Sequence, residues 1–520
     1  MISLCRHQIT PLVLLLLLQL SGCAVNPVTG EKELTLVSES QELAIGKKQY
    51  GPSRQMQGGD YRLDPKLTSY IQQVGQRLTA ESDRKLPYEF VVINDASPNA
   101  WALPGGKIAV NRGLLMELKN EAELAAVLGH EIVHAAARHG AKRMEKGLLL
   151  QGAVMAAGIA TQNSDYSRLA VGAATIGASL LSQRYSRGAE LESDYYGMVY
   201  MVRAGYDPRA AVGLQETFVR LSKAGESNWL SGLFSSHPPS AERVAKNRET
   251  AEQLGVHGGE LGERRYRRML SSLRKAEPAY AAYKQGGEAL QKKRHDQALS
   301  YAREAIAIEP AEALFHSLEG DALAGKKRNR EALASYNRAL ARDDGFFRHY
   351  LKRGELRVKL GNRSGAKSDL EQSLSLLPTA NAHHTLGRLA LDENDRRSAL
   401  THFKAASTSS SATGKAAAKA FLQLDLPENP HRYIRSRLGM DKGGRLIVQL
   451  ENPTSVTVER LRLQVGRLDA KGRLQRPVQY RVDRRMAPKD VIALRTRVSL
   501  QDRAELKQWG VQVIQAGVGE

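Results

Sequence analysis

The chain has 520 residues, which is too long for a single hydrophobic core, so it is expected to fold as two to four domains. Lysine and arginine (76) outnumber aspartate and glutamate (55), and the net charge of +21 favours contact with anionic surfaces such as phospholipid or lipopolysaccharide head groups. The basic residues are spread along the chain without a nucleic-acid-binding module, so no nucleic-acid partner is expected.

The first 22 residues are typical of a secretory signal, because residues 11–20 form an apolar run that is too short to remain as a membrane span. Leu20-Ser21-Gly22-Cys23 follows and resembles a bacterial lipobox, although an ordinary signal that contains a cysteine is the alternative. The resemblance implies cleavage before Cys23 and a lipid on its sulfur, and Ala24 resembles an outer-membrane sorting signal. We therefore expect a lipid anchor in the inner leaflet of the outer membrane, facing the periplasm.

A proline-free helical segment, 121–139, contains the run His130-Glu131-Ile132-Val133-His134. Residues four apart lie on one face of a helix, so both histidines can direct a ring nitrogen at one ion, and Glu131 can take a proton from the attacking water. Such strings also occur by chance in unrelated helices. Ala137 and Gly140 stand where a metzincin has glycine and histidine, and this excludes that subclass.

A later segment supplies the candidate third ligand. With the two histidines, Glu190-Leu-Glu-Ser-Asp194 resembles the E-x-x-x-D segment of the gluzincin family that includes HtpX, the prenyl-protein protease and the mitochondrial Oma-type protease. The resemblance implies that Glu190 is the third ligand and that Asp194 orients a ligand histidine. Glu192 competes as the ligand, but it lies about 200° around the helix from Glu190. One zinc ion per chain is therefore expected on His130, His134 and Glu190.

An earlier run, Asn99-Ala-Trp-Ala-Leu-Pro-Gly-Gly106, resembles the N-A-x-A-x-P-G-G hairpin of the same family. The resemblance implies an edge strand along which an extended substrate pairs through its backbone, with little side-chain selectivity. A hairpin with only a structural role is the alternative. The candidate substrate-binding residues are Asn99, Ala100, Trp101 and Ala102.

A downstream run, Ser236-His237-Pro-Pro-Ser-Ala-Glu-Arg243, resembles the family motif S-H-P-x-x-x-x-R. In the β-barrel assembly-enhancing branch of the family, the matching histidine can fill the open zinc position, so the resemblance implies that His237 keeps the enzyme latent. An oxyanion donor or a ring stacked on Pro238 are the alternatives. Arg243 is a candidate for binding substrate or stabilising the charge of the intermediate, with a structural ion pair as the alternative.

Two segments rich in glycine and alanine, 147–160 and 169–181, separate the two halves of the candidate metal site. Each is too short to cross a bilayer. We expect them to pack as buried helices, and dipping into the leaflet is the alternative.

The segment 276–426 repeats itself with a period of 33 or 34 residues, in which three rows of small residues keep in phase. This pattern resembles the tetratricopeptide repeat, in which small side chains let paired helices approach closely and stacked units share one core. An unrelated helical bundle is the alternative. The three rows are Gly286, Gly320, Gly354 and Gly387; Ala298, Ala332, Ala366 and Ala399; and Ala305, Ala339, Ser373 and Ala406.

The expected fold is multidomain. A signal (1–22) precedes a mainly α gluzincin metallopeptidase domain with a small β-sheet (23–262), an α-solenoid of about four tetratricopeptide repeats (276–426) and a small C-terminal β-sandwich (430–520), which short β-rich runs separated by turns predict.

The expected function is that of a zinc endopeptidase in protein quality control of the cell envelope, acting on misfolded or stalled outer-membrane or periplasmic proteins. Its expected partners are protein or peptide substrates, the envelope assembly machinery through the repeats, and the membrane through the lipid. The alternative is a chaperone or scaffold for outer-membrane protein assembly with little proteolysis.

Overall fold

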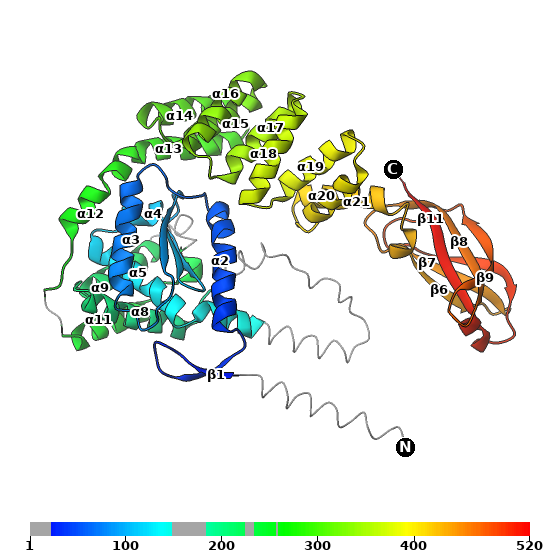
Figure 1. The fold of residues 1–520 in the computed structure, drawn as a ribbon, viewed down its shortest axis with the longest axis horizontal. Helices are drawn as coiled ribbons and strands as arrows, with labels where there is room; N and C mark the ends of the chain where they lie inside the picture. Colours follow the sequence, from blue (N-terminus) through cyan, green and yellow to red (C-terminus); the bar gives the residue numbers. More distant parts are fainter. Residues whose placement is uncertain (1–21, 148–183, 224–232, 256–257, 520) are drawn as a thin grey trace, which may run out of the picture. The chain divides into compact units, whose positions relative to one another are not determined.

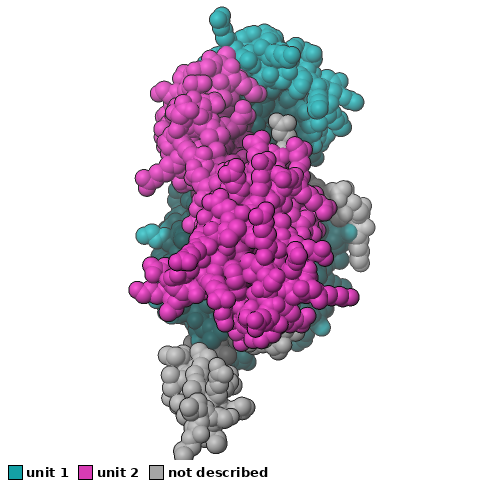
Figure 2. All heavy atoms as spheres, turned by 90° about the vertical axis from the view of Figure 1, so that its right-hand side faces the viewer, with its two compact units in different colours: residues 1–352 teal, residues 353–520 magenta. Residues whose placement is uncertain are grey.

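The computed structural model describes residues 22–147, 184–223, 233–255 and 258–519. The chain divides into two compact units, residues 1–352 and 353–520, which Figure 2 colours separately. No helix within the described ranges is long and apolar enough to cross a membrane. The two segments expected to form buried helices, 147–160 and 169–181, lie outside the described residues apart from Gly147.

The N-terminal part of the first unit surrounds a three-stranded sheet with helices (Figure 1). The strand order is β3-β5-β4, with β3 parallel and β4 antiparallel to β5, so β4 is an edge strand. Gly105 and Gly106 turn the chain between β4 and β5 at φ values of 77° and 78°, a left-handed conformation that favours glycine. The strands are β3 (Glu89–Ile93), β4 (Ala100–Leu103) and β5 (Lys107–Asn111).

Side-chain caps fix where the surrounding helices begin. Ser38 starts α2 with a reciprocal capping box, and Asn120, Ser186 and Ser240 each accept a backbone N–H at the start of α5, α8 and α11. An antiparallel hairpin, β1 (Gly22–Val25) with β2 (Lys32–Thr35), precedes them. The helices are α2 (Glu39–Met56), α3 (Pro65–Thr79), α4 (Arg112–Glu117), α5 (Glu121–Ala136), α8 (Arg187–Arg203), α9 (Arg209–Lys223), α11 (Ala241–Gln253) and α12 (Glu263–Met269).

Helix α5 is the centre of this part, and all of its residues are buried. It crosses α8 where two glycines face each other. A Cβ atom on Gly129 would lie 3.0 Å from the carbonyl oxygen of Gly197, and a Cβ on Gly197 would lie 3.0 Å from the backbone nitrogen of His130. The absence of both side chains therefore lets the two helix backbones come close enough for their side chains to share one site.

Gly197→Val is expected to force these helices apart. The added side chain would meet backbone atoms that cannot move aside, so we predict a loss of about 1–3 kcal/mol in the free energy of unfolding, together with weaker metal binding. Denaturant unfolding and metal titration measure the two effects. Gly188→Val, at a position on α8 with no atom within 4 Å of its Cβ, is the control. A Gly197→Val protein with unchanged stability and metal affinity would contradict the role of the crossing.

Paired helices follow in the order that the repeat period predicts. The rows of alanine and serine residues named above are all fully buried. A Cβ on Gly320 would collide with Tyr336, and one on Gly387 would collide with Phe403, so these glycines make room for an aromatic ring of the next helix. The helices are α13 (Ser271–Gln291), α14 (His295–Ile308), α15 (Ala313–Gly325), α16 (Asn329–Arg342), α17 (Phe347–Lys359), α18 (Arg363–Leu376), α19 (Ala380–Asp392), α20 (Arg396–Ala406) and α21 (Ala412–Asp425).

The first repeats contact the ends of strands β3 and β5 within the first unit. Asn94, directly after β3, donates a hydrogen bond to the buried Glu312 at 3.1 Å and accepts one from Arg112, directly after β5, at 2.9 Å. The guanidinium of Arg112 also lies 3.4 Å from the ring centre of Tyr280 in α13. Polar and cation–π contacts thus attach the repeats to the sheet.

The C-terminal segment forms two three-stranded antiparallel sheets, in the orders β10-β7-β6 and β11-β8-β9. Their inward side chains share one core, to which Leu446, Val448 and Leu450 contribute from one sheet and Leu461 and Leu463 from the other. The strands are β6 (Arg435–Met440), β7 (Arg445–Glu451), β8 (Val458–Leu468), β9 (Leu474–Val482), β10 (Val491–Ser499) and β11 (Trp509–Val518). The predicted fold class is confirmed: a mainly helical peptidase-like part with a small sheet, helical repeats and a β-rich end.

Candidate active site

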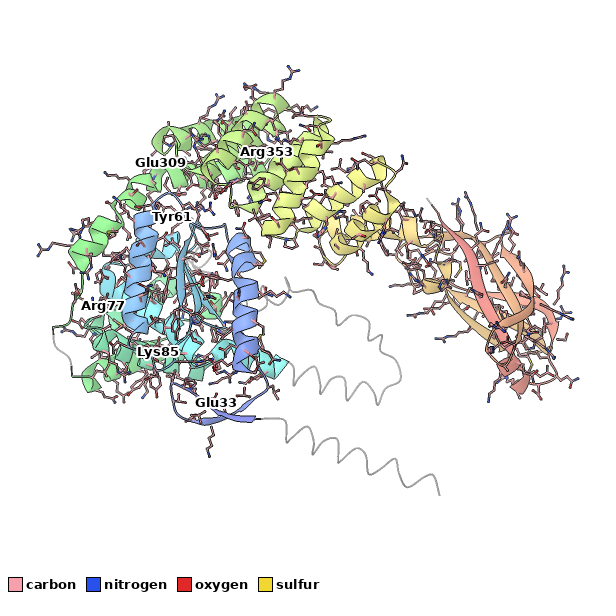
Figure 3. The ribbon with its side chains drawn as sticks, viewed as in Figure 1. Glu33, Tyr61, Arg77, Lys85, Glu309 and Arg353 are labelled. Atoms are coloured by element: carbon pink, nitrogen blue, oxygen red, sulfur yellow. The ribbon has the colours of Figure 1, made fainter. Side chains whose placement is uncertain are left out.

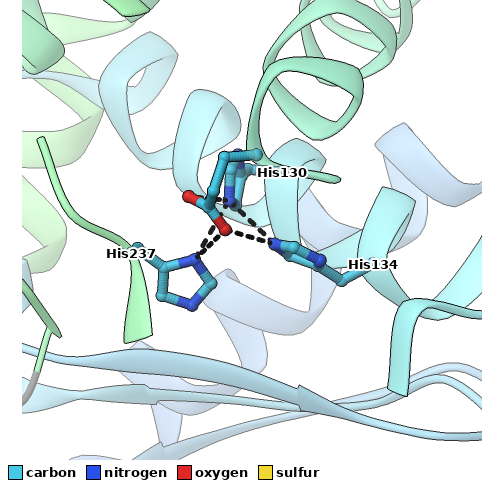
Figure 4. A group of neighbouring side chains, drawn as sticks. His130, His134 and His237 are labelled. Atoms are coloured by element: carbon cyan, nitrogen blue, oxygen red, sulfur yellow. Dashed lines mark hydrogen bonds and ion pairs between the residues drawn. The ribbon is translucent and has the colours of Figure 1, made fainter. Parts of the chain in front are cut away.

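Four buried side chains from three places in the chain converge on one point (Figure 4). His130 and His134 come from α5, Glu190 comes from the first turn of α8, and His237 lies shortly before α11. One potential ligand atom from each lies within 4.8 Å of all the others. The i, i+4 spacing places the two histidines on one face of α5, and Ser186 caps the start of the helix that carries Glu190.

The spacing of these donors fits a tetrahedral metal ion. The Nε2 atoms of His130 and His134 are 3.0 Å apart, and the Nε2 of His130 lies 3.2 Å from the Nδ1 of His237. An oxygen of Glu190 lies 3.0 Å from the Nδ1 of His237 and 3.3 Å from the Nε2 of His134. Ligands around a tetrahedral zinc ion are about 3.3 Å apart, given bonds of about 2.0–2.1 Å. The residues present thus fit a metal ion of this kind.

Asp194 and Arg243 hold the outer side of the cluster. The Nδ1 of His130 lies 2.8 Å from Asp194, so an N–H there donates to the carboxylate and turns Nε2 toward the common point. Arg243 donates two hydrogen bonds of 2.7 Å to Asp194 and lies 2.8 Å from an oxygen of Glu190. Burial raises the pKa of Asp194, but the charge and hydrogen bonds of Arg243 outweigh it and keep that pKa below its usual value.

Arg243 makes ion pairs in this arrangement. Its guanidinium is buried and contacts Asp194, Glu190 and the carbonyl of Pro238, and Arg243 also lines the cavity that His130 and Glu131 border. The alternative, a structural ion pair, matches these contacts. The role of Arg243 in binding substrate or stabilising the charge of the intermediate stays a prediction.

The side chains that contact His134 on the side away from the cluster were not predicted from the sequence. The Nδ1 of His139 lies 2.8 Å from the Nδ1 of His134, and its Nε2 lies 3.3 Å from Glu192. Tyr185 stacks on the His134 ring with centroids 3.8 Å apart. Glu192, the competing ligand, thus contacts the His139 ring instead of the metal-binding nitrogens. Arg138, with a φ of 63°, ends the helix and turns His139 back, which no helical spacing indicates.

Glu131 is buried beside the cluster, and one of its oxygens lies 3.5 Å from the Nε2 of His237. Its other oxygen has no hydrogen-bond partner among the described residues. Burial raises the pKa of Glu131, and the neighbouring His237 and His130 offset only part of that rise. A carboxylate with a raised pKa and a free oxygen is suited to accept and return a proton.

The predicted hairpin lies next to the cluster. Asn111 donates its N–H to the carbonyl of Asn99, so the alternation of an antiparallel ladder turns the N–H and C=O groups of Ala100 and Ala102 toward the edge of β4 that faces away from β5. Ala100 also lines a cavity together with His130, Glu131 and His237. The edge of β4 therefore leads to the candidate metal centre.

The side chain of Trp101 faces elsewhere. Its Nε1 donates to the side chain of Gln57 at 3.0 Å, and its ring packs edge-on against Tyr50 of α2. These contacts match the alternative given above for the hairpin, a purely structural role, as far as the Trp101 side chain is concerned. Cys23 is described only by its backbone, which pairs with Leu34 between β1 and β2.

The histidine pair on a central helix, the glutamate from a second helix and the adjacent buried Glu131 define a metallopeptidase domain. Residues 65–251 match Peptidase family M48. The chain is 27% identical over 350 residues to the beta-barrel assembly-enhancing protease of Yersinia pestis. The match covers 61% of this chain and 70% of that protein. It is 35% identical over 209 residues to the beta-barrel assembly-enhancing protease of Vibrio cholerae, and the match covers 36% of this chain and 40% of that protein.

Mitochondrial proteases are also similar to this chain. The OMA1 metalloendopeptidase of Arabidopsis thaliana is 36% identical over 165 residues, 30% of each chain. Among solved structures, the Arabidopsis OM64 TPR domain matches at 24% identity with a TM-score of 0.22, covering 23% of this chain and 98% of that one. The chain thus carries an M48 peptidase domain and is homologous to the beta-barrel assembly-enhancing and OMA1 proteases, as its motifs predicted.

Metal binding is predicted to release a proton from His130. Burial lowers the pKa of this ring, but the charges and hydrogen bonds of Glu190 and Asp194 raise it to about 10, so the ring is protonated at pH 8 after a chelator has removed metal. A ligand imidazole must be neutral, so zinc binding at pH 8 should release about one proton.

Calorimetric zinc titrations in two buffers with different ionisation enthalpies measure this proton release. Asp194→Asn, which removes one of the charges that raise the His130 pKa, should reduce it. A binding enthalpy that is the same in both buffers would contradict the prediction.

Proposed function

We propose that this protein is a zinc-dependent endopeptidase of the bacterial cell envelope that acts in protein quality control. One observation carries the proposal: three imidazole nitrogens and a carboxylate oxygen point at a common centre beside a buried glutamate. His130, His134 and Glu190 would hold one zinc ion, which would polarise the scissile carbonyl and the attacking water.

The residues of the chain would handle the substrate and the protons. The edge of β4 that faces away from β5, at Ala100 and Ala102, would pair with an extended peptide through main-chain hydrogen bonds. The carbonyl of Asn99 would keep β4 in register with β5, and the side chain of Trp101 would stabilise β4 through its contacts with Gln57 and Tyr50. Glu131 would accept a proton from the attacking water and deliver it to the leaving amine. Asp194, held by Arg243, would keep the His130 ring oriented throughout.

Glu131→Gln should abolish cleavage while zinc remains bound. The amide keeps the size of the side chain but cannot accept the proton, so kcat should fall by about 10²–10⁴-fold. Hydrolysis of casein and zinc content measured on the same preparation test this expectation. Glu249→Gln, an exposed glutamate on α11, is the control and should leave both values unchanged. Casein cleavage retained by Glu131→Gln would remove Glu131 from the chemistry.

His237 is proposed to keep the site latent. Its Nδ1 lies within 3.2 Å of both His130 and Glu190, at the fourth corner of the donor set, and its Nε2 faces Glu131. A fourth protein ligand would occupy the position that a catalytic zinc ion keeps open. The segment that carries His237 would then have to move before a substrate carbonyl can approach.

His237→Ala should therefore raise casein hydrolysis with zinc retained. If the closed arrangement is favoured by about 1.4 kcal/mol, the increase is about tenfold. His383→Ala, which removes a half-buried histidine from the repeats, is the control for the loss of an imidazole. Unchanged or lower activity with zinc still bound would contradict latency and would favour a direct role of His237 in the reaction.

The clients are proposed to be misfolded or stalled outer-membrane and periplasmic proteins, β-barrels among them. The relatives named for β-barrel assembly support this class. The helical repeats would recruit the clients or the assembly machinery, and a lipid on Cys23 would hold the protein at the inner leaflet of the outer membrane. Full rescue of a deletion strain by Glu131→Gln would instead favour a chaperone or scaffold.

A further inference from the structure

The C-terminal β-sandwich carries a disproportionate share of the positive charge. Residues 430–520 contain 19 lysines and arginines against nine aspartates and glutamates, so this segment contributes +10 of the net +21. The peptidase chemistry proposed above uses none of these residues. Side chains project from both outer surfaces of the sandwich (Figure 3), and these two surfaces are compared in turn.

One sheet carries five arginines on its outer surface. In β10-β7-β6 the buried and exposed positions alternate, with Leu446, Val448 and Leu450 facing the core. The register puts the alternate positions of all three strands on the opposite surface. That surface, named here the arginine face, carries Arg435 and Arg437 from β6, Arg445 from β7, and Arg495 and Arg497 from β10, all of them exposed.

Acidic groups neutralise only part of this face. Arg435 lies 3.4 Å from Glu451, and Arg495 lies 3.3 Å from Asp441 in the turn after β6. The side chains of Arg437, Arg445 and Arg497 have no ion-pair partner within the described part of the chain. Arg437 and Arg497 therefore have no ion-pair partner on this surface, and Arg445 has only the electrostatic attraction of Asp441. Val491, 57% exposed, adds an apolar side chain to the same surface.

The outer surface of the other sheet serves as the comparison. Its alternate positions on β8 and β9 hold Arg462, Gln464, Gln479 and Arg481, and the register pairs Arg462 with Arg481 and Gln464 with Gln479. Arg481 also pairs with Asp483. Arg460, Arg467 and Arg476 are further exposed arginines of these two strands, so this sheet is a comparison surface of similar charge.

We propose that the arginine face docks on an anionic phospholipid surface. Guanidinium groups bind phosphate oxygens through two parallel N–H donors. The surface of a sheet presents several of them side by side, so that they can contact a bilayer together. Each basic residue at an anionic membrane strengthens binding about fivefold. Single-stranded nucleic acid is less suited, because the outward positions of these three strands hold no aromatic ring on which a base could stack.

The test compares two triple variants of the full chain, both with Cys23→Ser so that no acyl group contributes. Arg437→Gln/Arg445→Gln/Arg497→Gln removes the three arginines of the arginine face that make no ion pair. Arg462→Gln/Arg476→Gln/Arg484→Gln removes three exposed arginines from elsewhere in the same sandwich and is the matched control. Sedimentation with vesicles of phosphatidylethanolamine and phosphatidylglycerol measures binding, with phosphatidylcholine vesicles and a DNA duplex as competitors.

The parent protein should bind the phosphatidylglycerol vesicles and not those of phosphatidylcholine. The arginine-face triple should lose about hundredfold in affinity, and the control triple should lose far less. Thermal unfolding of both variants shows that the sandwich remains folded. Equal losses in the two triples would overturn the proposal, since net charge and not this face would then decide binding. Displacement from the vesicles by an equal phosphate concentration of DNA would also overturn it, in favour of nucleic acid.

Discussion

The candidate centre depends on the close crossing of two helices. At Gly129 and Gly197 the backbones of α5 and α8 nearly touch, so side chains within about two turns of each glycine meet across the gap. His130 and His134 approach from one helix, and Glu190 and Asp194 approach from the other. A larger side chain at the crossing would separate the donors from each other without altering any of them. The site is thus a consequence of packing as well as of its chemical groups.

The charges around this crossing balance one another in a buried environment. Burying the carboxylates of Glu190 and Asp194 without cationic partners would be strongly unfavourable. Arg243 contacts both of them, and each carboxylate also faces an imidazole. Behind the second histidine, His139 and Glu192 provide a parallel support. The rings of both histidines on α5 are therefore fixed from outside the cluster, which leaves their inner nitrogens directed at one point.

Much of this arrangement could be predicted from the sequence, because it depends on regular spacing. The four-residue intervals in α5 and α8 place their side chains on one helix face, and the rows of small residues at a 34-residue period mark the contacts between paired helices. The alternation of apolar residues in the C-terminal strands indicated a sheet with one buried surface. The choice of Glu190 over Glu192 also followed from the helical angle, together with the family pattern.

Other features depend on irregular backbone or on distant partners, and spacing does not reveal them. His139 returns to the cluster through the left-handed residue Arg138, so its position in the sequence gives no indication of its contact with His134. The partners of Arg243 lie some fifty residues earlier in the chain, and a motif alone left its role open between substrate and ion pair. The arginine face likewise required the register of three strands to be known.

The metal content of two matched variants tests the central claim most directly. Glu190→Gln and Glu192→Gln make the same chemical change two residues apart on α8, and the account assigns a ligand to the first position only. Elemental analysis of the folded proteins should find about one zinc ion per chain in Glu192→Gln and far less in Glu190→Gln. Stoichiometric zinc in Glu190→Gln, or its loss only from Glu192→Gln, would contradict the proposed centre.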